Sequence, residues 1–297
     1  MTVLRSMLFI PGDSEKKLAK GDGSGADALI LDLEDAVAPE NKPIARQRTA
    51  AYLAGRPRGR RPMQLWVRVN PFDTGMTLAD LAAITGGAPD GIMAPKVDGP
   101  EDVRRLSHYL DAFEAQAEVE PGSIRILPVA TETAIAPFHL GNYAAAKLDR
   151  LFGLTWGAED LSTAIGASTN LGPDGQWALT YQIVRSMTLL GAQAAGVQAI
   201  DTLYTNFRNE AGLRASCAVA AAEGFTGRIA IHPAQVAAIN ESFSPSNEDI
   251  AHAQAVIAAF DASAGAGAVQ LNGKMLDIPH LKQARNVLAR AGALQES

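Results

Sequence analysis

The chain has 297 residues, 47% of them hydrophobic, and a formal net charge of −6. This composition predicts a globular protein with a large core, and the acidic balance excludes the basic surface typical of nucleic-acid and membrane-surface proteins. The single cysteine, Cys217, excludes an internal disulfide. The N-terminus shows no apolar signal core, and no apolar run reaches the ~20 residues needed to span a bilayer, so we expect a cytoplasmic protein.

Eight short apolar runs follow one another along the chain, separated by segments with helical patterning. Nearly every run ends in polar residues, as expected of buried parallel strands that present side chains at their carboxyl ends. This series predicts a (β/α)₈ TIM barrel whose active site is formed by the loops after the strands. The runs are Leu4–Ile10, Ala28–Leu33, Gln64–Val69, Gly91–Ala94, Ile124–Ala130, Arg150–Thr155, Gln198–Leu203 and Arg228–Ile231.

An arginine ends the third run, next to acids that follow the second. Arg68 offers a planar fork for a carboxylate or for the developing oxygen of an enolate. The alternative is an ion pair with Glu34 or Asp35 from the neighbouring strand end, and both roles are compatible. We therefore take Arg68 as a candidate substrate-binding and catalytic residue.

Two acids follow the fifth and sixth runs. Barrel geometry brings neighbouring strand ends together, so Glu132 and Asp160 are expected to lie close to each other. Two carboxylates form a site for a hard cation such as magnesium, which keeps several waters and leaves positions for substrate oxygens. The alternative is that both acids cap the helices that follow. Gly157 and Ala158 precede Asp160, and their backbone amides are candidates for binding an anionic oxygen.

Other catalytic patterns are missing from the sequence. No glycine-rich dinucleotide fingerprint follows the first run, and no P-loop pattern occurs. The five histidines are scattered, which argues against a zinc site, and we interpret His232, before Pro233, as a structural residue at a strand end.

The chain continues well beyond the eighth run. Helices are predicted near Pro233–Phe243 and Asn247–Ala262, followed by the glycine- and alanine-rich link Ala264–Ala268. We expect a catalytic barrel over residues 1–240 and a C-terminal helical extension over residues 241–297. The extension carries the segment Gly273–Asp277, which the flexible link would allow to reach away from the barrel.

Taken together, the motifs of this chain resemble the citrate lyase β-subunit-like family, which includes malyl-CoA and citramalyl-CoA lyases and lies within the HpcH/HpaI aldolase superfamily. Each motif is modest alone, and their order over nearly the whole length makes the resemblance specific. The motifs are Arg5–Gly12, Asp32–Val37, Val67–Asn70, Ala94–Lys96, Gly157–Leu161, Ile231–Gln235 and Gly273–Asp277.

The resemblance implies a magnesium-dependent carbon–carbon lyase, with manganese as an alternative metal, that forms a homotrimer or hexamer. Glu132 and Asp160 match the family's metal ligands, and Arg68 matches its arginine for the oxoacid. Asp277 matches an aspartate that the CoA lyases present across a subunit interface as acid or base. Lys42 and Arg46 fall where relatives place basic residues near the coenzyme A phosphates, with surface ion pairing as the alternative.

The implied reaction is reversible cleavage of a 3-hydroxyacyl-CoA, of the citramalyl-CoA or malyl-CoA type, to acetyl-CoA and a 2-oxoacid such as pyruvate or glyoxylate. Two alternatives stay open. A class II aldolase would cleave free hydroxy-oxoacids without coenzyme A, and a citrate lyase β-subunit would need an acyl-carrier partner. Relatives commonly have an aliphatic residue where this chain has Thr131, which leaves the oxoacid open.

Overall fold

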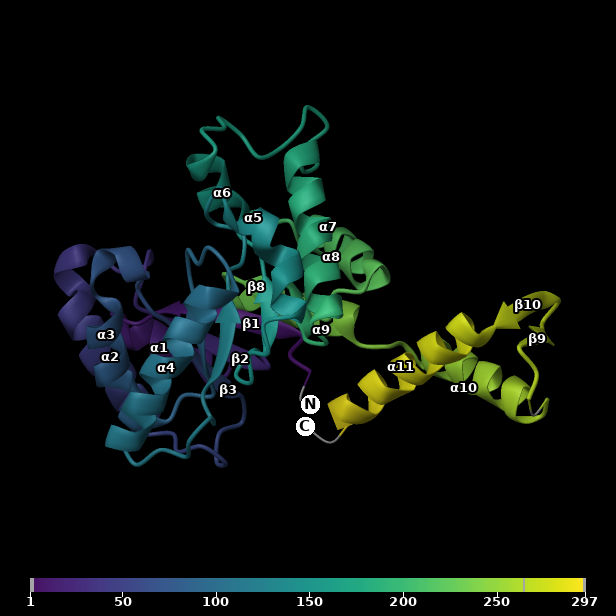
Figure 1. The fold of residues 1–297 in the computed structure, drawn as a ribbon, viewed down its shortest axis with the longest axis horizontal. Coiled ribbons are helices and arrows are strands. Elements are labelled where there is room, and N and C mark those ends of the chain that lie inside the picture. Colours follow the sequence, from purple (N-terminus) through teal and green to yellow (C-terminus); the bar gives the residue numbers. More distant parts are fainter. Residues whose placement is uncertain (1–2, 264, 296–297) are drawn as a thin grey trace.

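The computed structural model describes residues 3–263 and 265–295 and contains the predicted barrel (Figure 1). Each of the eight parallel strands overlaps the apolar run predicted for it, so the barrel fold is confirmed. The strands are β1 Ser6–Pro11, β2 Ala28–Asp32, β3 Gln64–Arg68, β4 Gly91–Ala94, β5 Arg125–Pro128, β6 Gly153–Thr155, β7 Gln198–Asp201 and β8 Gly227–Ala230.

The barrel closes between β5 and β6. The ladder runs in the order β5-β4-β3-β2-β1-β8-β7-β6, with parallel pairing at each step. Backbone hydrogen bonds join its two ends: the Ile126 amide donates to the Arg150 carbonyl at 2.8 Å, and the Ala130 amide donates to the Thr155 carbonyl at 2.8 Å. Closure places the loops that carry Glu132 and Asp160 side by side.

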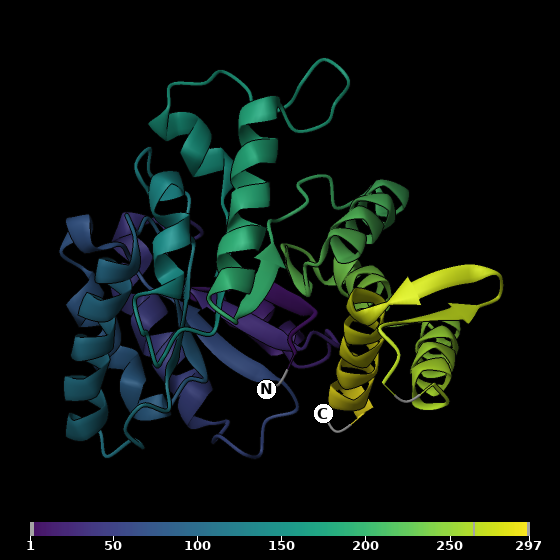
Figure 2. The same ribbon diagram turned by 45° about the vertical axis from the view of Figure 1, so that its right-hand side comes forward.

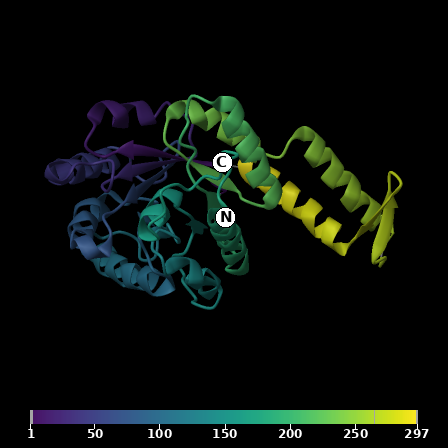
Figure 3. The same cartoon turned by 90° about the horizontal axis from the view of Figure 1, so that it is seen from above.

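Helices surround the strands, as Figure 3 shows from above. The α-helices of the barrel are α1 Glu15–Gly21, α2 Lys42–Ala54, α3 Thr77–Ile84, α4 Pro100–Gln116, α5 Ala136–His139, α6 Ala158–Ala164, α7 Leu179–Ala194, α8 Glu210–Glu223 and α9 Val236–Phe243. The 3₁₀ turns are η1 Pro39–Asn41, η2 Phe72–Thr74, η3 Thr85–Gly87, η4 Leu140–Ala144 and η5 Pro233–Gln235.

Strand alternation decides which side chains reach the barrel interior. On β3, Leu65 and Val67 pack outward in the core between strands and helices, whereas Trp66 packs inside the barrel beside Phe152. Arg68 has the same parity as Trp66 and ends the strand. Its guanidinium therefore lies inside the barrel at the carboxyl-terminal mouth.

The C-terminal extension forms a separate unit that projects from the side of the barrel (Figure 2). It consists of α10 Asn247–Asp261, the antiparallel strands β9 Ala268–Leu271 and β10 Lys274–Asp277, and α11 Ile278–Gln295. Val256, Phe260, Leu276 and Leu281 form its own small core. The extension was predicted to be helical, and the hairpin is an additional finding.

Two local features explain that hairpin and the start of the extension. Asn272 and Gly273 form the turn between β9 and β10 with φ of 50° and 77°, the left-handed pair that an Asn-Gly hairpin requires. The predicted boundary at residue 240 lies inside α9, and the extension's first helix starts only at Asn247. No helix in residues 3–263 and 265–295 combines the length and apolar character needed to cross a membrane.

Candidate active site

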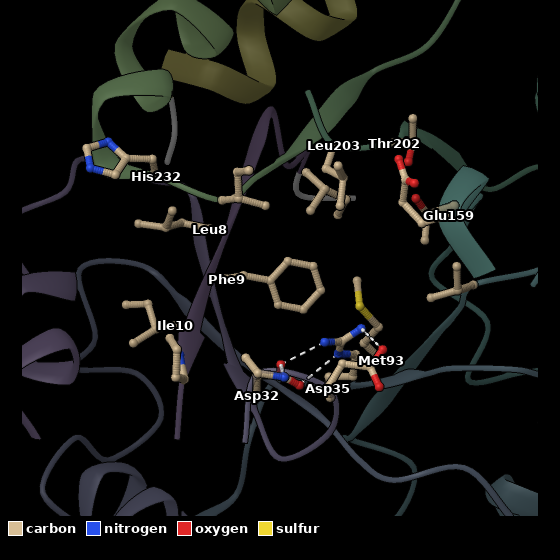
Figure 4. A pocket seen from close by; sticks show the side chains of 18 of the residues that line it. Leu8, Phe9, Ile10, Asp32, Asp35, Met93, Glu159, Thr202, Leu203 and His232 are labelled. Atoms are coloured by element: carbon tan, nitrogen blue, oxygen red, sulfur yellow. Dashed lines mark hydrogen bonds and ion pairs between the residues drawn. The ribbon is translucent and has the colours of Figure 1, made fainter. Parts of the chain in front are cut away.

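A cavity of about 980 Å³ opens at the carboxyl ends of the barrel strands. Arg68, Glu132, Gly157, Ala158 and Asp160, five of the predicted site residues, all line it. Figure 4 shows Phe9 in the middle of this cavity, with Asp32 on one side and His232 and Glu159 at opposite ends. The structure thus brings together residues from strands that are far apart in the sequence.

Arg68 is held by acids from the neighbouring strand β2. Its Nε and Nη2 atoms donate to the two carboxylate oxygens of Asp32, both at 2.7 Å, and Nη1 lies 2.8 Å from Glu34 Oε2. Burial opposes the charged form, but the bond to Asp32 and the charges of Asp32 and Glu34 raise the pKa of Arg68 overall. The guanidinium is therefore fixed in position and charged.

The partners predicted for Arg68 were Glu34 and Asp35, and the bidentate partner Asp32 was missed. Asp35 lies only at 3.9 Å. A signal for Asp32 existed, because it is the one charged residue inside the apolar run of β2. A buried acid in such a run requires a partner on an adjacent strand, and its Cα partner in the ladder is Arg68.

Glu132 and Asp160 form the acidic part of the cavity. Glu132 is 6% exposed, and its Oε2 accepts a hydrogen bond from the Lys96 amide at 2.7 Å. Burial, followed by the negative charge of Asp160, raises the pKa of Glu132 to about 8. Both carboxylates line the same cavity.

Lys96, which follows β4, forms ion pairs with three acids at the mouth of the barrel. Its Nζ lies 2.5 Å from Glu34 Oε1, 3.2 Å from Asp160 Oδ1 and 3.5 Å from Asp35 Oδ2. Burial opposes the charge, but Glu34 and then Asp160 raise the pKa of Lys96 overall. Lys96 has no predicted role, although its position just after β4 matches that of the other site residues, which also follow strands.

The donor set fits magnesium. Glu132 and Asp160 supply hard carboxylate oxygens to the same cavity. Residues 3–263 and 265–295 hold no group of three or more His, Cys, Asp or Glu side chains arranged for a metal. Magnesium accepts this arrangement, in which two protein carboxylates bind the ion and water or substrate fills its remaining coordination positions.

Gly157 differs from its predicted role. Its amide donates to the Thr131 hydroxyl at 3.0 Å, so this N–H is not available to a substrate oxygen, and only Ala158 remains as a backbone candidate. A Cβ on Gly157 would lie 2.9 Å from Cγ and Oε1 of Glu132. A side chain at position 157 would therefore force the Glu132 side chain to shift, and Thr131 ties the loop that carries Glu132 to the start of α6, which carries Asp160.

Lys42 and Arg46 point into the protein. Lys42 is 8% exposed, and its Nζ donates to the carbonyls of Leu33 and Glu34, both at 2.7 Å. Arg46 Nε lies 2.7 Å from the buried Asp80 carboxylate. Neither side chain lines the cavity. The structure gives both side chains partners within the protein: the Lys42 ammonium holds the loop after β2, and Arg46 pairs with Asp80. Contact with the coenzyme A phosphates stays a prediction for both residues.

Two other lysines do line the cavity. Lys17 and Lys20, on α1, are exposed and line the rim of the cavity. Their spacing of three residues places both on one face of the helix, which was a signal available in the sequence.

Asp277 lies outside the cavity of its own chain. It ends β10 on the extension, and its Oδ1 contacts His280 Nδ1 at 2.5 Å. It shares the outward face of the hairpin with Met275, which is 79% exposed. The predicted acid or base is therefore presented on a surface rather than in the barrel.

The family model described as HpcH/HpaI aldolase/citrate lyase matches residues 5–233. The chain belongs to this family. It is 35% identical to a mitochondrial citramalyl-CoA lyase of Rattus norvegicus, over 98% of this chain and 87% of that protein. It is also 35% identical to a citrate lyase subunit beta of Haemophilus influenzae, over 98% of both chains. Arg68, Glu132 and Asp160 lie within the region that the HpcH/HpaI family model matches, whereas Asp277 lies beyond it.

A solved structure matches the whole fold. The protein CitE of Mycobacterium tuberculosis, in complex with magnesium, acetoacetate and coenzyme A, superposes with a TM-score of 0.77 at 32% identity, covering 98% of each chain. The family relationship therefore extends over the barrel and the extension together.

Proposed function

We propose that this protein is a magnesium-dependent carbon–carbon lyase that cleaves a 3-hydroxyacyl-CoA to acetyl-CoA and a 2-oxoacid. The observation that carries the proposal is the joint placement of Arg68, Glu132 and Asp160 in one cavity at the barrel mouth. Relatives named citramalyl-CoA lyase, and a neighbour bound to magnesium, acetoacetate and coenzyme A, support this substrate class.

Glu132 and Asp160 would hold the metal. When bound there, magnesium supplies a Lewis acid that polarises the hydroxyl and carboxylate oxygens of the substrate. Arg68, fixed by Asp32, orients the same carboxylate and neutralises charge on its oxygens. The positive charge of Arg68, together with that of the metal held by Glu132 and Asp160, would stabilise the substrate after it has lost its hydroxyl proton.

Cleavage then follows from the electron balance. A base, to which no residue of this chain is assigned, takes the hydroxyl proton. The freed electron pair on oxygen forms the carbonyl of the 2-oxoacid as the adjacent carbon–carbon bond breaks, and the bonding pair of that bond passes to the thioester as an enolate. The enolate carbon then takes one proton to give acetyl-CoA. We assign the Asp277 carboxyl group as the donor of this proton. In the condensation direction, the Asp277 carboxylate acts as the base that removes the proton from acetyl-CoA.

Asp277 would reach the cavity from another subunit. The extension has its own core and holds Asp277 on an outward hairpin face beside the exposed Met275, as expected of a surface that docks elsewhere. This supports the homotrimer or hexamer implied by the family resemblance. We further propose that Lys17 and Lys20 bind the phosphates of coenzyme A, and that the enzyme works in the cytoplasm.

The test is a condensation assay. Protein and magnesium are mixed with acetyl-CoA plus pyruvate, glyoxylate or oxaloacetate, and products are identified by mass; cleavage of citramalyl-CoA and malyl-CoA then sets the preference. Glu132→Ala and Asp160→Ala should each remove metal-dependent turnover while the fold is kept. Turnover of free hydroxy-oxoacids without coenzyme A would instead favour the aldolase alternative, and activity only with an acyl-carrier partner would favour a citrate lyase subunit.

A further inference from the structure

Charged side chains of both signs gather at the mouth of the barrel. The acids nearest the proposed metal site are Asp32, Glu34, Asp35, Glu132 and Asp160, and the cations that contact this group or its loops are Lys42, Arg68 and Lys96.

The three cations are not equivalent. Arg68 is committed to Asp32 by two hydrogen bonds, and Lys42 is committed to the carbonyls of Leu33 and Glu34. Lys96 is the one whose side chain contacts a proposed metal ligand, with its Nζ 3.2 Å from Asp160 Oδ1.

The backbone of Lys96 is also part of the arrangement. Lys96 has φ of 51°, a left-handed conformation that a non-glycine residue adopts at an energetic cost. In this conformation its amide donates to Glu132 Oε2 at 2.7 Å while its side chain reaches Asp160. One residue thus contacts both proposed ligands, through two different groups.

We propose that Lys96 is a positioning residue that sets the affinity of the magnesium site, because its ammonium competes with the divalent ion for Asp160. The inference rests on the proposed function, since it assumes that Glu132 and Asp160 bind the metal. Lys96 forms ion pairs with Glu34 and Asp160 and so holds these acids close together. Magnesium can bind Asp160 only by weakening the Lys96–Asp160 ion pair. Its contact with Glu34, at 2.5 Å, lets the ammonium stay in the site after Asp160 is taken.

The experiment measures magnesium binding by calorimetry in the full-length wild type and in Lys96→Met. Removing a unit charge next to a ligand carboxylate should tighten magnesium binding about tenfold, well within the size of a close charge interaction at a partly buried site. In EDTA the variant should melt at a lower temperature than the wild type, and magnesium should raise its melting temperature by more.

Two further variants keep the result interpretable. Lys96→Gln also removes the charge and retains a hydrogen-bond donor for Glu34, so it replaces the methionine variant if the latter fails to fold. Lys16→Met removes the same charge from an exposed position on α1 that does not line the cavity, and should change magnesium affinity by less than about twofold because solvent screens an exposed charge.

Unchanged or weaker magnesium binding in both Lys96 variants would overturn the inference, since it would mean that Lys96 does not compete for Asp160. That result leaves the proposed function intact as long as the wild type binds magnesium. A wild type that binds no magnesium would count against the metal site itself, and so against both.

Discussion

Replacing Gly157 with alanine should damage the metal site without disturbing the barrel. Gly157 precedes α6 with φ of −121°, a conformation open to any residue, so its backbone does not require glycine. The constraint is space: a Cβ would lie 2.9 Å from Cγ and Oε1 of Glu132 and 3.3 Å from its Cδ.

The size of the effect follows from these distances. Ordinary contacts begin at 3.4 Å, so the Glu132 side chain must move by about 0.5 Å (3.4 minus 2.9) or push the α6 loop away. Overpacking of this kind costs about 1–3 kcal/mol of stability, and a ligand displaced by a substantial part of an ångström loses on the order of tenfold to a hundredfold in rate.

Calorimetric titration with magnesium, thermal unfolding and the steady-state cleavage assay together measure the effect. The matched control is Gly141→Ala, because a Cβ there meets no atom within 4 Å and Gly141 does not line the cavity. We expect Gly157→Ala to bind magnesium at least about tenfold more weakly than Gly141→Ala. Equal magnesium affinity and equal turnover in the two variants would refute the steric argument and with it the placement of Glu132.

Three other changes test separate parts of the site. Arg68→Lys should lower kcat/KM by about a hundredfold, because a point charge cannot make the two parallel bonds to Asp32; near-normal kinetics would show that the fork is dispensable. Lys42→Met should reduce stability to unfolding by about 1–3 kcal/mol, since two carbonyls lose their donor, while the KM for the acyl-CoA is unchanged; a raised KM would restore a role in binding. Asp277→Asn should bind acetyl-CoA yet fail to exchange its methyl protons in deuterated water, and exchange at the normal rate would exclude Asp277 as the acid.

The barrel could be predicted because its signal is local. Each strand is a short apolar run with polar residues at its end, and each of the eight strands overlaps its predicted run. The extension's helices were predicted for the same reason. Its hairpin was not, because β9 and β10 are four residues each and only one face of the pair, with Val269 and Leu276, is covered.

The candidate site was predicted in part. Arg68, Glu132 and Asp160 could be found because barrel topology brings strand ends to one mouth, whatever their separation in sequence. The surroundings of Lys42 could not be predicted, because helical spacing shows which residues share a face of a helix and does not show which way that face turns. In the structure the Lys42 ammonium lies against the loop after β2.

The number and order of the strands, the acids and the arginine at the mouth, and the family can all be read from the amino-acid sequence, since they depend on residue type and spacing. Which charges pair could be learned only from the folded structure. Asp32 rather than Asp35 holds Arg68, Lys96 reaches Asp160, and Gly157 makes room for Glu132, because such contacts depend on distances of a few tenths of an ångström between strands. Pairing at that scale is set by strand register and barrel closure, which only the folded chain defines.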